Sequence, residues 1–494
     1  MAVTAPTGAE RSGSGARPAR RLPALLVLAG LVLAAAVADR SAPGGPAHAA
    51  PAPARQRLQP GAAPGSALAS AWYCPLATTA PGSAARGLLA LANSGDTELG
   101  ANDTVMPAQG KAASRAVRLP PRAQVTVGLA DIVTTTADAP WVAALVEIDG
   151  GQAAAEEVVF GPSGVALTPC ASSASDHWYF AEGSTGRDPT LLLGLFDPFP
   201  DDAIVDLSFT TDQGRAEPAD FKGLVVPGRG LLVVDVGQHV RRRDLVSTTV
   251  AARSGRIVAS RLQVRGGAPA LGTTLDLGAP SAGTSWYFPD GATGNGIVER
   301  YQLYNPSNRE SQAQLSLVLD QGEAEPFHLT VPPQGTVGVV TSAEPRVPQG
   351  VPHGAVVAVT NGVPLVAERV VAATAPASRH GLLDVLGARA PARRWLLALG
   401  ATNPATDEWV VVLNPGPDRA AFSVQALAAG QLLGVEGLQG LQVDPGQRRA
   451  VRLGDHIRRD DLALVVSSDR PVVVERDLYT GGGSGMAASI AELG

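Results

Sequence analysis

The chain has 494 residues, of which 45% are hydrophobic and 17% are charged, and its formal net charge is −6. A chain of this length suggests about three or four domains, and its hydrophobic content is enough to form sizeable cores. The small negative net charge excludes the basic field with which proteins attract nucleic acid.

The N-terminus has the pattern of an export signal. Three arginines between residues 17 and 21 precede an apolar run at 22–38, LPALLVLAGLVLAAAVA, and small residues at 36–38 and 47–49 fit a cleavage site. Seventeen residues are at the lower limit for a membrane span. Residues 1–38 are therefore predicted to be a signal peptide or a retained N-terminal membrane anchor, and either one places the rest of the chain outside the cytoplasm.

The next segment, residues 39–70, consists mainly of Ala, Pro, Gly and Ser and has no apolar period. Such a composition buries too little surface to fold, so a disordered linker is predicted here.

After the linker the sequence repeats four times. WYCPLATTA, WYFAEGSTG, WYFPDGATG and WLLALGATN begin at Trp72, Trp178, Trp286 and Trp395, with steps of 106, 108 and 109 residues. Later landmarks keep the same phase, including a Pro or Gly turn between two apolar runs and a strand-like run about 80 residues after each tryptophan. The predicted repeats are 71–177, 178–285, 286–394 and 395–494, with the four tryptophans as core residues that mark each repeat.

Each repeat reads as β-structure, because its apolar runs are short, rich in Val, Leu and Ile, and separated by turn residues. The predicted fold is all-β, with four tandem immunoglobulin-like β-sandwich repeats of about 107 residues arranged as a rod or arch. An alternative is that each repeat supplies two four-stranded blades to a propeller.

The two cysteines, Cys74 and Cys170, fall in the first and last predicted strands of the first repeat. An even pair in an exported chain predicts a disulfide that joins these strands. Two free buried thiols are the alternative, and a metal site is less favoured because no histidine is near in the sequence.

The recurrent W-Y-F-x-[ED]-G-x-T, with its downstream L-x-N-P, VPP turn and A-E-R strand, resembles an uncharacterised family of exported tandem-repeat proteins, found mainly in high-GC Gram-positive bacteria. The resemblance covers residues 178–494 well and residues 72–177 less well. It implies an envelope or secreted location and an all-β repeat, and it supplies no catalytic residues.

No catalytic, cofactor or metal constellation is visible in the sequence, so none is predicted. GQHVRRRDL at 237–245 and GDHIRRDDL at 454–462 place His239 and His456 at equivalent positions. They are weak candidates for a surface site that binds an anionic polymer, and solvated loops are the alternative.

Two further patterns in the sequence contain acidic residues. Asp197, Asp201 and Asp202 suggest calcium, although three carboxylates supply too few ligands, and a stiff acidic turn is the favoured interpretation. The Glu-Arg pairs at 368–369 and 475–476 lie on predicted strands, where adjacent side chains point to opposite faces. They cannot converge on one substrate, and we expect one member to reach a cross-strand or inter-domain partner.

The expected function is that of a non-catalytic exported cell-envelope protein, acting as a multidomain scaffold, spacer or adhesion module. A carbohydrate- or peptidoglycan-binding accessory protein is the alternative, and an envelope hydrolase is a remote one. The expected partner is an envelope protein or polymer, without nucleic acid and with membrane contact only through the N-terminal segment. Solvent exposure of Trp178 and Trp286 would favour a ligand-binding surface, whereas burial would favour a role in the core.

Overall fold

The computed structural model describes residues 59–494, apart from residues 84, 163, 267–270, 323, 429 and 482–484, and all of these belong to one compact unit. The predicted signal or anchor at 1–38 and the linker as far as residue 58 lie outside the described residues. Among the described residues, none forms a helix that is long and apolar enough to cross a membrane.

The first two repeats consist of short strands with single turns of 3₁₀ helix. Repeat 1 contains β1 (Ser70–Thr78), β2 (Arg86–Asn93), β3 (Leu99–Pro107), β4 (Ala113–Leu119), β5 (Ala123–Gly128), η3 (Leu129–Asp131), β6 (Trp141–Ile148), β7 (Ala153–Gly161) and β8 (Gly164–Pro169). Repeat 2 contains β9 (His177–Phe180), β10 (Thr190–Asp197), β11 (Ala203–Thr211), β12 (Gly214–Ala216), η4 (Ala219–Phe221), β13 (Leu224–Val226), β14 (Gly230–Asp235), η5 (Val236–Gln238), β15 (Val246–Ser254), β16 (Val258–Arg265) and β17 (Gly272–Leu277).

The last two repeats follow the same order. Repeat 3 contains β18 (Ser285–Phe288), β19 (Ile297–Tyr304), β20 (Ser311–Leu319), β21 (Phe327–Val331), β22 (Thr336–Val340), η6 (Thr341–Ala343), β23 (His353–Val359), β24 (Val366–Ala373) and β25 (Gly381–Leu386). Repeat 4 contains β26 (Ala392–Leu397), β27 (Thr406–Asn414), β28 (Ala420–Ala428), β29 (Gln431–Gly434), β30 (Leu441–Val443), β31 (Gln447–Arg452), η7 (Leu453–Asp455), β32 (Ala463–Thr480), β33 (Gly485–Ile490) and β34 (Glu492–Leu493).

Each repeat builds two antiparallel arrays of four to six strands. The first, which we call the axial sheet, has the order β5-β2-β7-β8 in repeat 1, β14-β10-β16-β17 in repeat 2, β22-β19-β24-β25 in repeat 3 and β31-β27-β32-β33 in repeat 4. The second, the flanking sheet, is built around β3-β6-β1, β11-β15-β9, β20-β23-β18 and β28-β32-β26. In repeat 4 the long strand β32 belongs to both sheets, and in repeat 1 a single parallel pairing between Thr78 and Arg86 joins them. The prediction of an all-β chain is confirmed.

The two sheets of a repeat face each other across a hydrophobic core. In repeat 2, alternate residues of β11 such as Val205 and Leu207 point inward and pack with Trp178 of β9 and Leu193 of β10. The cores also run from one repeat into the next. The cluster around Trp72, for example, includes Leu262 of repeat 2.

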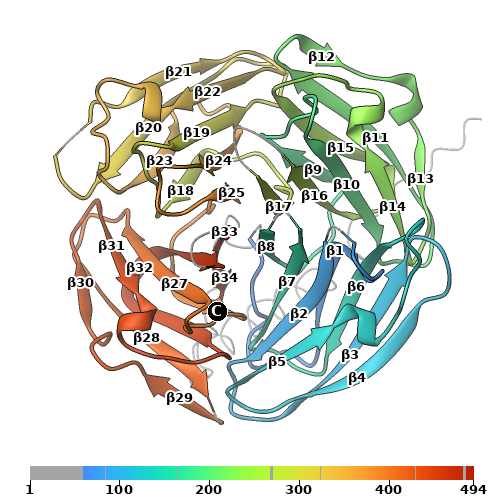
Figure 1. Ribbon diagram of the computed structural model, residues 1–494, viewed down its shortest axis with the longest axis horizontal. Helices are drawn as coiled ribbons and strands as arrows, with labels where there is room; N and C mark the ends of the chain where they lie inside the picture. The colour runs from blue at the N-terminus through green and yellow to red at the C-terminus, as the bar shows by residue number, and fades with distance from the viewer. Residues whose placement is uncertain are drawn as a thin grey trace, which may run out of the picture. The chain divides into compact units, whose positions relative to one another are not determined.

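The four repeats close into a ring (Figure 1). The last strand of each axial sheet lies at the centre, where β8 contacts β17, β17 contacts β25, β25 contacts β33, and β33 returns to β8. Each flanking sheet also packs on the axial sheet of the following repeat, as β1 does on β10 and β16. The arrangement is therefore propeller-like, as in the alternative drawn from the sequence, and immunoglobulin-like sandwiches are not confirmed. An open rod or arch is wrong, because the last repeat contacts the first.

A short segment at the start of the described chain completes the ring. This strap, Gln59–Ala63, pairs with β34 through hydrogen bonds from Leu493 N to Pro60 O and from Ala62 N to Leu493 O, and Ala63 O accepts from Gln152 N of repeat 1. The buried side chain of Gln59 accepts hydrogen bonds from the backbone N–H groups of Arg389 and Ala390 in repeat 3.

The strap corrects one sequence expectation. The sequence predicts a disordered linker at 39–70, but the strap is an integral part of the ring and Ser70 is the first residue of β1. The composition gave no sign of this, because backbone hydrogen bonds rather than apolar side chains hold the strap in place.

Candidate functional site

Buried Arg–Glu ion pairs join successive repeats at three of the four junctions. In each pair the arginine comes from the axial sheet of one repeat and the glutamate from the axial sheet of the next, and no side chain is more than 1% exposed. The pairs are Arg261–Glu368 at 2.8 Å, Arg369–Glu475 at 2.6 Å and Arg476–Glu156 at 2.8 Å. The expectation that one member of each Glu-Arg dipeptide reaches another repeat is confirmed, and both members do so.

The geometry of a strand explains this arrangement. Glu368 and Arg369 are adjacent on β24, so their side chains leave opposite faces of the sheet toward the preceding and the following repeat. Glu368 also accepts hydrogen bonds from the backbone N–H groups of Ala181 and Glu182, at 3.0 and 2.9 Å. The WYFAEG motif thus presents its backbone to a buried carboxylate of the next repeat.

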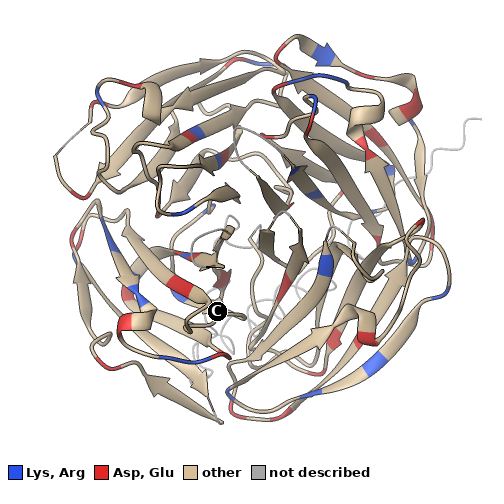
Figure 2. Ribbon diagram, viewed as in Figure 1, with Lys and Arg blue, Asp and Glu red and all other residues tan. Residues whose placement is uncertain are grey.

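The acidic residue of that motif serves the same junction. Glu182 is buried and pairs with Arg300 of repeat 3, while Asp290 of WYFPDG pairs with Arg448 of repeat 4. Charged residues of both signs are otherwise interspersed around the ring (Figure 2). Glu182 and Asp290 are therefore structural residues of these junctions.

The junction between repeats 1 and 2 lacks an Arg–Glu pair. Glu157 stands where the other repeats have arginine, and Ser260 stands where they have glutamate. Glu157 Oε2 accepts a 3.4 Å hydrogen bond from Leu76 N, and burial without a cation raises the pKa of Glu157 to about 8. This carboxyl group is therefore mainly protonated at neutral pH.

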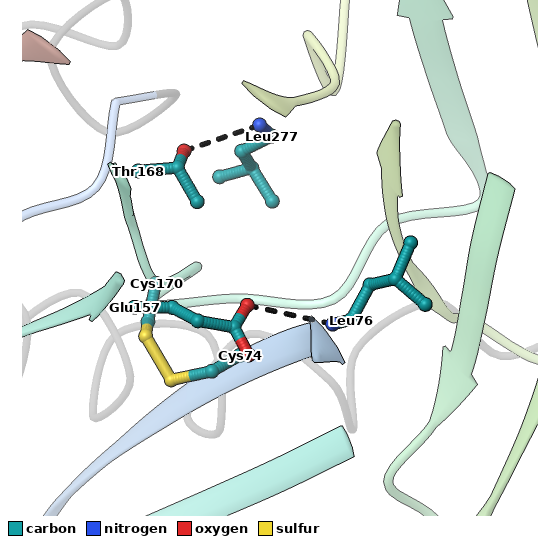
Figure 3. The surroundings of a disulfide bond; sticks show 6 residues. All are labelled: Cys74, Leu76, Glu157, Thr168, Cys170 and Leu277. Carbon is teal, nitrogen blue, oxygen red and sulfur yellow. Dashed lines mark hydrogen bonds between the residues drawn. A yellow bond between two sulfur atoms is a disulfide. The ribbon is translucent and has the colours of Figure 1, made fainter. Parts of the chain in front are cut away.

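The cysteine pair lies at this same junction (Figure 3). Cys74 and Cys170 form a buried disulfide with a Cα–Cα distance of 4.7 Å, as predicted from the sequence. Beside it, Thr168 Oγ1 accepts a hydrogen bond from Leu277 N of repeat 2. The disulfide therefore joins two segments of repeat 1, beside the junction where the described residues form no Arg–Glu pair.

A denser cluster surrounds Arg261. Its guanidinium donates to Asp276 at 2.9 Å, Glu368 at 2.8 Å and Asp384 at 2.6 Å. Burial raises the pKa of Asp276 to about 7 and that of Asp384 well above its usual range, because one cation cannot compensate three desolvated carboxylates. Burial therefore favours the protonated form of Asp276 and Asp384 in this cluster.

Repeat 3 contains the arrangement most like a catalytic constellation. Glu299 Oε2 lies 2.7 Å from His353 Nε2 and accepts a 2.7 Å hydrogen bond from Thr341 Oγ1. Burial acts to lower the pKa of His353, but the charge of Glu299 outweighs it and the pKa is raised, as expected for an ion pair. Thr341 donates to the carboxylate rather than to the imidazole, and both charged groups are completely buried. The cluster therefore offers neither an activated nucleophile nor access for a substrate.

Sequence reasoning missed His353, although a signal was present. Val246 and Leu462 make the same backbone hydrogen bond in repeats 2 and 4 that His353 makes in repeat 3. A histidine in repeat 3, where repeats 2 and 4 have valine and leucine, was the signal that could have identified His353.

The four marker tryptophans are buried in the ring. Trp178, Trp286 and Trp395 donate their indole N–H groups to backbone carbonyl oxygens about 80 residues later in the chain, at distances of 2.8, 3.0 and 3.0 Å. Trp72 is equally buried, and its Nε1 has no partner among the described residues. None of the four offers an exposed aromatic face to a ligand.

The two motif histidines remain apart. His239 lies 3.2 Å from Asp220 and packs edge-on against Phe221, whereas His456 Nδ1 lies 3.0 Å from the Glu436 carbonyl oxygen. Each contact stays within its own repeat, so the histidines themselves form no common site.

The acidic turn in repeat 2 is held by backbone groups. Asp197 Oδ1 accepts from Phe199 N and Asp202 Oδ1 from Gly228 N, both at 2.9 Å. Within the part of the chain that the structure describes, no group of three or more His, Cys, Asp or Glu side chains is placed to hold a metal ion.

Comparison with known proteins identifies relatives without a known activity. The profile of a family of unknown function, DUF5719, matches residues 160–273 and 278–492. No curated protein matches the chain.

Among solved structures, three similarities are weak. Thermotoga maritima 1070 is 15% identical, with 22% of this chain and 94% of that chain covered and a TM-score of 0.20. The Anabaena sensory rhodopsin transducer is 18% identical, with 18% and 88% covered and a TM-score of 0.16. Streptomyces avermitilis alpha-L-rhamnosidase, solved with L-rhamnose, is 9% identical, with 79% and 55% covered and a TM-score of 0.10. Scores this low carry no argument about this chain.

Proposed function

The chain belongs to the DUF5719 family of unknown function, and on that premise we propose that it is a non-catalytic scaffold of the cell envelope that engages its partners through the surface of a closed ring. The observation that carries the proposal is the use of its buried charges. Arg261, Arg369 and Arg476 each bind a carboxylate of the following repeat, so the strongest electrostatic contacts hold the ring together.

The burial of the remaining reactive groups supports the same proposal. Glu299 and His353 are sealed inside repeat 3, and Glu157 and Glu408, whose pKa values burial raises to about 8, are likewise completely buried. A general acid or base must reach its substrate, and these groups do not meet solvent.

The proposed location is extracytoplasmic, either secreted or anchored by the N-terminal segment. The Cys74–Cys170 disulfide supports it, because such bonds persist in oxidising compartments. The arginine residues before the apolar run at 22–38 belong to the sequence pattern of export and lie outside the described residues.

Carbohydrate or peptidoglycan binding remains the alternative within this proposal. The buried tryptophans do not favour an aromatic platform, so a glycan would have to be recognised by polar groups at the surface. An envelope hydrolase would need an accessible acid–base pair, and no observation favours one.

The test is affinity capture with the full-length chain purified without reductant. The immobilised protein is incubated with an extract of the organism's own cell envelope, with a cytoplasmic extract and the heat-unfolded chain as matched controls. We expect an envelope polymer or protein to be retained only by the folded ring. Equal retention from cytoplasm, or release of wall fragments by the soluble protein, would overturn the proposal.

A further inference from the structure

A polar cleft of about 600 Å³ lies at the junction of repeats 3 and 4. We call it the arginine cleft, because Arg379 from the β24–β25 loop, Arg452 at the end of β31 and Arg458 after η7 line it. Its volume is in the range of small-molecule sites and far exceeds that of a simple inorganic ion.

Two of the arginines are held in place before any ligand arrives. Asp407 accepts hydrogen bonds from Arg452 Nε at 2.8 Å, from Arg379 Nη2 at 3.1 Å and from Trp409 Nε1 at 3.1 Å. The Arg379 guanidinium also stacks on Tyr479, 3.5 Å from the ring centroid. A site positioned in this way loses little side-chain entropy when it binds.

The cleft retains unused donors and an excess of positive charge. Nε and Nη1 of Arg379 and the whole guanidinium of the exposed Arg458 have no hydrogen-bond partner among the described residues. Three guanidinium groups face the carboxylates of Asp407 and Asp455, so the lining carries one net positive charge. Guanidinium forks favour carboxylate and phosphate oxygens, which they bind in pairs.

Acceptors and smaller polar groups lie beside these donors. Asp455 receives only a 3.4 Å contact from Arg452, and the side chains of Ser378 and Thr406 complete the lining. Such a set can accept hydrogen bonds from hydroxyl groups while the arginines bind an anion. A bare anion would leave these groups unused.

The cleft lies away from the point where the chain enters the ring. Arg379 precedes β25, whereas Arg389, whose N–H donates to Gln59 of the strap, follows it. The six residues of β25 separate these ends by about 20 Å. The cleft therefore opens at the end of the central strands opposite the strap.

We propose that the arginine cleft binds an acidic sugar, that is, a saccharide unit that carries a carboxylate or a phosphate group. The arginines bind the anionic group, and Asp455 with the neighbouring hydroxyl groups binds the sugar hydroxyls. The inference goes beyond the scaffold proposal, because it gives the ring a ligand and a site.

The chain supplies a matched control for the test. Arg241 occupies the position in GQHVRRRDL that Arg458 occupies in GDHIRRDDL, but its Nε donates to Gln238 O in repeat 2. Arg458→Gln and Arg241→Gln therefore make the same chemical change at equivalent loops. Thermal unfolding of both variants establishes that neither exposed substitution alters the fold.

Isothermal titration calorimetry of the full chain with glucuronic acid, glucose 1-phosphate, glucose and inorganic phosphate decides the question. We expect one or both acidic sugars to bind, with Arg458→Gln weakening the affinity about ten-fold and Arg241→Gln leaving it unchanged. Preference for glucuronic acid or for glucose 1-phosphate identifies the source of the anionic group.

Three outcomes would overturn the inference: no binding of either acidic sugar, equal affinity for glucose, or equal affinity for inorganic phosphate. An equal loss in the two variants would do so as well. These failures leave the scaffold proposal untouched, since capture of an envelope partner does not depend on Arg458.

Discussion

Arg476 of the last repeat and Glu156 of the first form a two-point ion pair, with Nη2–Oε1 and Nη1–Oε2 distances of 2.8 and 3.0 Å and neither side chain exposed. The two residues are 320 positions apart in the chain. Their contact joins the last repeat to the first, and Arg–Glu pairs also join repeat 2 to repeat 3 and repeat 3 to repeat 4. Ring closure therefore depends on a charge pair as well as on hydrophobic packing.

Breaking this pair should destabilise the ring strongly. Arg476→Met leaves Glu156 buried without its cation, which typically costs about 3–5 kcal/mol. The double variant Arg476→Met/Glu156→Leu removes both charges and should lose much less. Chemical denaturation of the wild type, both single variants and the double variant measures the coupling. Additive losses would show that the two residues do not interact in solution.

The protonated Glu157 predicts a pH dependence at the junction of repeats 1 and 2. Burial raises its pKa from 4.5 to about 8, so the fold favours the protonated acid. This stabilisation is complete below the unfolded-state pKa and is lost as the pH rises through about 8. Between these values the free energy of unfolding should fall by up to about 1.4 kcal/mol per pH unit on account of this group.

Glu157→Gln tests that dependence, because the amide stays neutral and keeps an oxygen for Leu76 N. The difference in unfolding free energy between the variant and the wild type should grow in favour of the variant from pH 5 to pH 8. Denaturant titrations across this range measure it. A constant difference would mean that Glu157 is ionised in the folded protein.

Asp197 is predicted to stabilise its repeat less than asparagine would at the same position. Asn414 ends the corresponding strand of repeat 4, where its Nδ2 donates to Asp418 O and Val443 O at 2.8 and 3.1 Å. Asn305 makes the matching contacts in repeat 3. A carboxylate cannot donate these bonds, and burial raises the pKa of Asp197 to about 6.

Asp197→Asn should therefore raise the free energy of unfolding by about 1–3 kcal/mol at neutral pH. The reverse change, Asn305→Asp, should lower it. Thermal and chemical unfolding of the two variants supply the comparison. Similar effects of the same sign would show that the turn does not depend on the amide.

The repetition of the sequence made much of the fold predictable. Trp72, Trp178, Trp286 and Trp395 keep phase with several other landmarks, so strand content and repeat number followed directly, and Cys170 fell in register with Gly278. Ring closure did not follow, because it depends on the orientation of neighbouring repeats relative to one another, which no local pattern encodes. The strap was missed because its partners lie far away in the sequence, and those of Gln59 are the backbone N–H groups of Arg389 and Ala390, 330 and 331 residues later.

The candidate sites were less predictable than the fold. The Glu-Arg dipeptides predicted an inter-repeat contact. Adjacent side chains on a strand point to opposite faces, so the two cannot meet at one site and one of them is expected to reach another repeat. The arginine cleft gave no such sign, since Arg379 and Arg458 belong to different repeats and come together only where repeats 3 and 4 pack against each other. In the motif GDHIRRDDL, the residue that lines the cleft is Arg458 and not His456.

The disulfide occupies a position that repeats 2 and 3 fill with a phenylalanine ring packed against a glycine. In repeat 2, a Cβ atom added to Gly278 would come within 2.8 Å of the Phe180 ring, and in repeat 3 one added to Gly387 would come within 2.7 Å of Phe288. Cys74 takes the place of the phenylalanine and Cys170 that of the glycine. The Phe–Gly pair and the disulfide are thus alternative ways of filling the same space.

Cys74→Ser/Cys170→Ser should destabilise the protein by about 2–5 kcal/mol, the usual cost of removing a native disulfide. Cys74→Phe/Cys170→Gly should recover part of that loss, because the aromatic ring fills the volume against a glycine as it does in repeats 2 and 3. Denaturant unfolding under non-reducing conditions ranks the three proteins. If the Phe–Gly variant is no more stable than the serine variant, the first repeat has a packing arrangement that the other repeats do not share.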